Sequence, residues 1–167
     1  MVADLVVAIF ALGLLGLALR RAGSAYLVFR GTRVITCPGT GQHAAVDLAA
    51  GRAALTAVFR APTPGLRDCS RWTGQTDCNR ECLTQIRASP EEGLVRRILT
   101  KWYGGKSCVS CGRPLAEIHW TRRKPCLMSP GLRILEWKDI PPETIPRVLE
   151  THGPVCWNCF VAETRTW

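Results

Sequence analysis

The chain begins with its longest apolar stretch, which runs from Val2 to Leu19 and is interrupted only by Asp4. A helix over these residues is apolar on every side, whereas a helix on the surface of a soluble domain has one polar face. At ~1.5 Å per residue this length barely spans a ~30 Å hydrocarbon layer, and continuation through Phe29 adds reach. The pattern predicts a membrane-spanning anchor within residues 1–30. A cleaved signal peptide and a buried core helix are the alternatives.

Short segments typical of strands follow the anchor. Val34–Thr36 and His43–Leu48 flank a turn, and alternating apolar positions over Leu55–Phe59 predict a third strand. Together they predict a small antiparallel β-meander, which ends in the segment 61–65 with its two prolines and a glycine.

The centre of the chain has helical spacing. Residues 77–86 predict a short helix, and a second is predicted by an apolar stripe made of Leu94, Val95, Ile98, Leu99 and Trp102. Ser89, Pro90 and Glu92 match a capping box with proline at the first helical position. We therefore expect the second helix to begin at Pro90, with Ser89 as its N-cap, and to end at the glycines 104–105.

The last third of the chain predicts a separate small module. Strands are expected at 116–120 and 132–137 with a turn at 129–131 between them, and a helix at 142–149 with a kink or restart at Pro146. The expected class is α+β, in three parts: an anchor with its juxtamembrane segment (1–30), a meander with helices (31–105) and a cysteine-rich module (106–167).

Charge orients the anchor. Arg20, Arg21, Arg30 and Arg33 lie after the apolar stretch, and no Lys or Arg precedes it. Because cytoplasmic flanks of membrane helices are enriched in positive charge, we expect the remaining chain in the cytoplasm. The net charge of +9 suits contact with anionic lipid. It also suits nucleic acid, but the basic residues are scattered and cluster only at 122–124, so this is the lesser alternative.

Two Cys-x-x-Cys pairs predict a metal site. Cys108 and Cys111 precede Gly112, and Cys156 and Cys159 stand near the C-terminus. Each pair lets one tight turn direct two sulfurs to a point, so the two pairs supply the four thiolates of a tetrahedral Zn²⁺ site. Iron or an iron–sulfur cluster is the alternative, and a pair of redox-active dithiols is a third interpretation. Rubredoxin-like iron sites usually have glycine after both turns, so Phe160 favours zinc.

Cys37, Cys69, Cys78 and Cys82 form a second candidate set of four thiolates. Their spacing is irregular, and it suits zinc, a two-iron cluster or a role as small buried residues. Cys126 is left without a partner and is expected in the core. Three histidines are candidate replacement ligands at either site: His43, His119 and His152.

The cysteine motifs also carry a resemblance. The run from Cys108 to Pro114, with the later Cys156–Cys159, resembles zinc-ribbon and treble-clef modules. The whole chain resembles an uncharacterised group of bacterial single-pass membrane proteins with a cysteine-rich cytoplasmic domain, through segments 36–38, 68–72, 81–83 and 154–159. The resemblance implies an anchored metal-binding protein and carries no established activity.

The sequence contains no catalytic motif: neither a zinc-protease helix, nor a nucleophile elbow, nor a phosphate loop, nor a dinucleotide fingerprint. Four thiolates also leave a zinc ion no open position for catalysis. We therefore expect a non-enzymatic protein without a small-molecule substrate. It would act as an accessory subunit or adaptor that binds another protein at the membrane. An electron-transfer subunit of a membrane redox complex is the alternative if the metal is iron.

Overall fold

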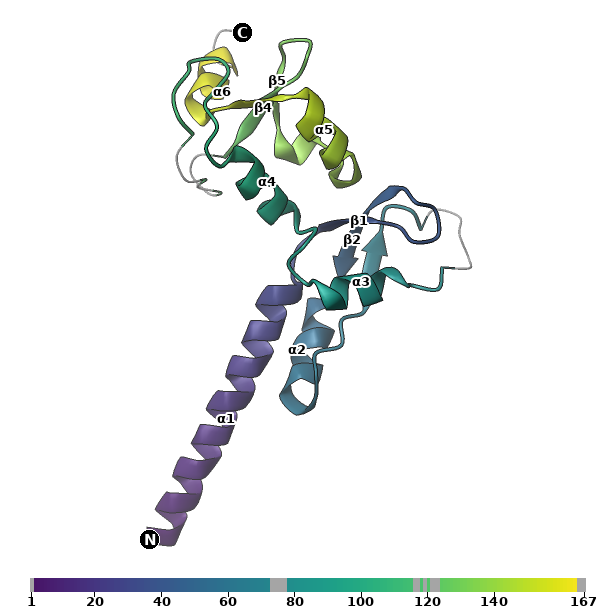
Figure 1. Cartoon of the computed structure of the whole chain (residues 1–167). Coiled ribbons are helices and arrows are strands. Elements are labelled where there is room, and N and C mark those ends of the chain that lie inside the picture. Colours follow the sequence, from purple (N-terminus) through teal and green to yellow (C-terminus); the bar gives the residue numbers. More distant parts are fainter. Residues whose placement is uncertain (1, 73–77, 116–117, 119, 121–123, 165–167) are drawn as a thin grey trace.

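The computed structural model describes residues 2–72, 78–115, 118, 120 and 124–164, and it confirms a mixed α+β class (Figure 1). The N-terminal half contains α1 (Val2–Phe29), β1 (Arg33–Thr36), β2 (His43–Leu48), α2 (Ala50–Phe59), β3 (Leu66–Cys69), α3 (Cys82–Ala88) and α4 (Val95–Tyr103). The C-terminal half contains β4 (Cys126–Met128), β5 (Ile134–Glu136), η1 (Trp137–Asp139), η2 (Pro142–Thr144), α5 (Ile145–Thr151), β6 (Gly153–Val155) and α6 (Trp157–Thr164).

Helix α1 extends away from the rest of the molecule, with the N-terminus at its far end (Figure 1). Its large apolar side chains are exposed along most of its length, and only Ala25 and Phe29 near its C-terminal end are buried. Among the described residues, α1 is the one helix long and apolar enough to cross a membrane. A core helix of a soluble domain buries such side chains, and α1 does not.

The first sheet has the strand order β1-β2-β3, with both pairs antiparallel. Val46 in the central strand opposes Arg33 on one side and Cys69 on the other. One face of the sheet packs with α3 and the end of α1 in a cluster that contains Val46, Ile86 and Phe29. The sheet therefore sits directly beside the point where α1 ends.

The expected strand at Leu55–Phe59 is wrong, because these residues belong to helix α2. Ala53 and Ala57 lie one turn apart and are buried where α2 packs along α1. Alanine has the highest helix propensity and allows close helix packing, so this contact outweighs the local alternation. Leu55 and Phe59 are 74% and 90% exposed. The third strand of the sheet is instead β3.

The expected helix start at Pro90, with Ser89 as N-cap, is also wrong, because α4 begins at Val95 and residues 90–93 form a turn. The backbone of this segment pairs with β1: the N–H of Val34 donates to the carbonyl of Gly93 (2.7 Å), and the N–H of Val95 donates to Thr32 (3.1 Å). Gly93 has φ +79°, and a Cβ there would lie 2.5 Å from the Val34 oxygen. Pairing with the strand thus overrides the local capping signal.

The second sheet has the order β5-β4-β6, again antiparallel. Its central strand β4 was not expected, and β5 is shorter than the expected strand because Leu132 takes φ +60° and Trp137 begins η1. Helix α5 carries Pro146 in its first turn, where proline is tolerated. Most of the strand expected at 116–120 lies outside the described residues, as does 122–123 of the basic cluster.

One core links the two halves. Leu99 and Tyr103 of α4 pack with Leu127, Ile140 and Ile145 of the C-terminal half, and Val34 of β1 joins the same cluster. The helical stripe predicted in α4 is thus core. The proposed boundaries between the three parts of the chain stay a prediction.

Arg33 is a fully buried charged side chain at the junction of these elements, with 0% exposure. Its guanidinium donates to the carbonyls of Val28, Phe29 and Gly31 at the end of α1, and to Pro90 in the turn before α4. The last carbonyls of a helix have no partner within the helix and carry partial negative charge. Arg33 therefore supplies hydrogen-bond donors to the carbonyls at the end of α1 and links this end to β1 and the 90–93 turn.

We predict that Arg33→Met destabilises the folded body by about 3 kcal/mol or more, because each buried carbonyl left without a donor costs about 1–3 kcal/mol. Thermal unfolding of the full chain in detergent, followed by tryptophan fluorescence, should show a lower Tm. Arg30→Met is the matched control, since Arg30 is exposed. Equal Tm values for the two variants would contradict the role of Arg33.

Candidate metal centre

The first cysteine pair lies on a closed turn. The N–H of Cys108 donates to the carbonyl of Arg113 (2.8 Å), and the N–H of Gly112 donates back to the carbonyl of Cys108 (2.8 Å). Gly112 has φ +71°, a conformation that glycine adopts without the penalty of a Cβ. We call residues 108–113 the first knuckle. It presents the sulfurs of Cys108 and Cys111 on one side of the turn.

The second pair lies where β6 passes into α6. Val155 ends β6 and is fully buried, Cys156 follows it, and Cys159 lies in the first turn of α6. The N–H of Val109 donates to the carbonyl of Pro154 (2.9 Å), which joins the first knuckle to β6. The N–H of Cys156 donates to the sulfur of Cys108 (3.3 Å). These hydrogen bonds therefore hold the two cysteine pairs next to each other.

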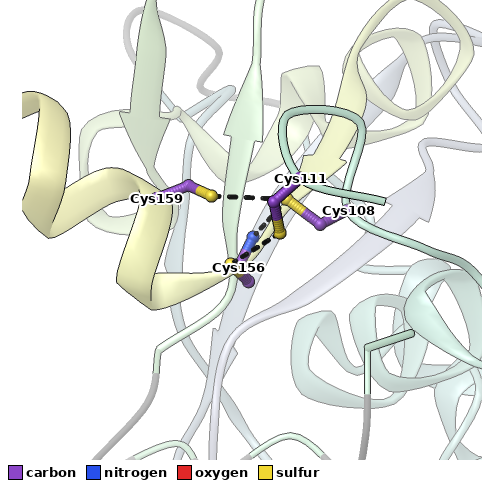
Figure 2. A group of neighbouring side chains, drawn as sticks. All are labelled: Cys108, Cys111, Cys156 and Cys159. Atoms are coloured by element: carbon purple, nitrogen blue, oxygen red, sulfur yellow. Dashed lines mark hydrogen bonds between the residues drawn. The ribbon is translucent and has the colours of Figure 1, made fainter. Parts of the chain in front are cut away.

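The four sulfurs converge, as Figure 2 shows. All lie within 4.8 Å of one another; Cys108 and Cys159 are 3.9 Å apart at Sγ, and Cys111 and Cys156 are 3.8 Å apart. A tetrahedron of ~2.3 Å zinc–sulfur bonds has sulfur–sulfur edges of about 3.8 Å. A disulfide needs ~2.05 Å. The separation therefore fits four ligands around one ion, as the sequence predicted, and does not fit cystines.

Ionisation of the four thiols favours a cation at their centre. Burial opposes the thiolate of Cys108, but the backbone N–H groups of Cys156, Cys111 and Ser110 bring its pKa down to about 6. Burial and then the neighbouring sulfurs raise the pKa of Cys159 to about 12. A dication relieves this conflict, so metal binding releases protons and weakens as pH falls.

Apolar side chains close one side of the site. Trp157 and Phe160 of α6 pack with ring centroids 5.1 Å apart, in a cluster that contains Cys108, Val155 and Cys126. Cys126 is fully buried in β4, and burial, then the charge of Glu136, raises its pKa to about 12. It is a core residue, as expected, and lies outside the ligand set.

The other candidate ligands have different surroundings. In the described part of the chain, no second group of three or more candidate ligands is drawn together as tightly as these four. His43 is exposed in β2, and His152 follows the end of α5, where it contacts Thr151. His119 lies outside the described residues. The second cysteine set, Cys37, Cys69, Cys78 and Cys82, stays a prediction.

Comparisons with known proteins assign no function to the chain. The chain matches no protein-family model, no curated protein and no solved structure.

The contact of Val109 with Gly153 was not foreseen from the sequence, since only the fold brings them together. A Cβ on Gly153 would lie 2.8 Å from Cγ1 of Val109. We predict that Gly153→Ala pushes the first knuckle away from β6, at a cost of about 1–3 kcal/mol for overpacking. Zinc affinity, measured by competition with a chelator, should fall about tenfold for each ~1.4 kcal/mol.

Val109→Ala is the matched second change, because it removes both methyl groups that the new Cβ would meet. The double variant should regain most of the zinc affinity. If Gly153→Ala binds zinc as tightly as the original chain, the packing of the knuckle against β6 does not support the site.

Proposed function

We propose that the chain is a membrane-anchored zinc protein without enzymatic activity, which serves as an accessory subunit or adaptor for another protein at the membrane. The observation that carries the proposal is the convergence of four cysteine sulfurs at tetrahedral spacing. With four thiolates a zinc ion has no free position for water or substrate, which favours a structural role. An ordered domain beside a membrane, without an open catalytic position, suits binding of a protein partner.

Two features of the site favour zinc over iron. Phe160 continues α6 after the second pair, where a glycine turn is usual in rubredoxin-like iron sites. The second pair also lies at the start of a helix, which favours the treble-clef-like resemblance over the zinc-ribbon-like one. Zinc then joins β6, α6 and the first knuckle around a small apolar cluster.

The anchor is supported by the surface of α1. Its apolar side chains find no partner in the folded body along most of the helix. A groove of about 740 Å³ lies where α1 meets α2, and Arg20, Arg21 and Arg60 contribute to its lining. Arg20 and Arg21 directly follow the apolar stretch of α1, and arginines in that position suit anionic headgroups of the cytoplasmic leaflet. The exposed Leu55 and Phe59 of α2 suit the same interface.

The metal is tested on full chain purified in detergent without oxygen. We predict zinc, no iron, and no visible absorption that dithionite bleaches. Cys111→Ser with Cys159→Ser should lose the zinc bound at this site, whereas Cys126→Ala should keep it because Cys126 is buried outside the ligand set. Stoichiometric iron with a bleachable spectrum would instead establish the electron-transfer alternative.

The anchor is tested by extraction of membranes with alkaline carbonate and by the intact mass of the extracted protein. We predict that the chain stays in the membrane fraction and that its mass includes residues 2–29. Leu12→Arg with Leu15→Arg should release it, since each arginine at the centre of a membrane helix costs about 2.5–3.5 kcal/mol. A mature chain that lacks the apolar stretch would identify it as a signal peptide.

A further inference from the structure

The turn at residues 37–42 repeats the backbone hydrogen bonds of the first knuckle. The N–H of Cys37 donates to the carbonyl of Gln42 (2.8 Å), and the N–H of Gly41 donates to the carbonyl of Cys37 (2.8 Å). Gly41 has φ +68°, against +71° for Gly112. Cys37 thus occupies the position that Cys108 has in the first knuckle. We call residues 37–42 the second knuckle.

The second knuckle differs at one ligand position. Thr40 stands where the first knuckle has Cys111, so this turn supplies one sulfur instead of two. The side chain and the backbone N–H of Thr40 interact with the Cys37 sulfur.

The sheet brings a second sulfur to the same face. Cys69 opposes Val46 of β2, whereas Thr36 at the end of β1 opposes His43, so the two cysteines are offset along the strands but lie on one face of the sheet. Cys37 follows the last residue of β1, and Cys69 is the last residue of β3. Both side chains pack against one cluster, of which Cys82 is a buried member with 6% exposure.

Helix α3 brings a third sulfur to this face. Cys82 is its first residue, and Cys78 lies four positions before it, outside the helix. The guanidinium of Arg80 lies 5.9 Å from the ring of Trp72. The N–H of Trp72 donates to the carbonyl of Cys69 (3.0 Å). These contacts hold the segment with Cys78 and Cys82 beside the turn that follows Cys69.

We propose that Cys37, Cys69, Cys78 and Cys82 bind a second zinc ion, on the face of the first sheet that packs against α3. The thiols lose their protons on binding, and no oxidant or reductant is needed. Cys37, Cys69 and Cys82 already share a cluster, and the exposed Cys78 completes the set by turning inward from the segment before α3.

Three of the four thiols are gathered at one cluster, and like charges disfavour each other's ionisation. A bound dication offsets this repulsion and links α3 to the sheet across the intervening segment. This site is independent of the metal centre at Cys108–Cys159 and does not rest on the proposed function.

The test is the zinc content of the full chain, measured by native mass spectrometry from detergent under reducing conditions. We expect two zinc ions in the unchanged chain, one in Cys37→Ser with Cys82→Ser, and one in Cys111→Ser with Cys159→Ser. Cys126→Ala is the matched control and should retain both. The zinc ion that Cys111→Ser with Cys159→Ser retains should be removable by a chelator. Its retention in this variant locates the second ion at the remaining cysteines.

A single zinc ion in the unchanged chain, lost in the C-terminal variant, would overturn the second site and leave the proposed function intact. If Cys37→Ser with Cys82→Ser does not fold, cobalt titration of the unchanged chain decides. Two equivalents with the intense visible bands of tetrahedral cobalt thiolates support the second site, and saturation at one equivalent overturns it.

Discussion

The arrangement of the N-terminal half depends on the hydrogen bonds that the buried guanidinium of Arg33 donates. A long apolar helix must end where its last carbonyls can find donors, and here one side chain provides them. Its contact with Pro90 brings the turn before α4 to the same place. The neighbouring Val34 then packs in the core of the C-terminal half. Two adjacent positions in β1, Arg33 and Val34, thus connect the end of α1 with both parts of the folded body.

The C-terminal half relies on a different kind of contact. Its smallest cluster buries only Cys108, Cys126 and Val155 completely. A structural zinc contributes about 10–16 kcal/mol in small peptides, which exceeds the ~5–15 kcal/mol net stability of an ordinary domain. Without a cation, the raised pKa of Cys159 opposes joint ionisation of the four thiols. A metal bound at these sulfurs would therefore couple folding of this part to metal binding.

Local signals in the sequence predicted what depends on local chemistry. The apolar stretch predicted α1, β-branched residues predicted β1, and the spacing of Cys108 with Cys111 predicted converging sulfurs. The failures lie where distant segments decide the backbone. Ala53 and Ala57 form a helix because α1 lies beside them, and Gly93 leaves the helix because β1 binds it. No property of Ser89 or Phe59 reveals those neighbours.

The irregular spacing of the second cysteine set has a physical explanation in the same terms. A knuckle with cysteine at both ligand positions needs only two further sulfurs to complete a four-thiolate site. A second Cys-x-x-Cys pair at the start of a helix supplies them, so the sequence shows two regularly spaced pairs. The second knuckle has Thr40 in place of a cysteine, so a metal there needs another sulfur from outside the turn. In the proposed site this sulfur comes from Cys69, whose position is set by its pairing with Val46 of β2 and not by sequence distance. A search for repeated Cys-x-x-Cys pairs therefore misses such a site, although the backbone hydrogen bonds of the two turns are the same.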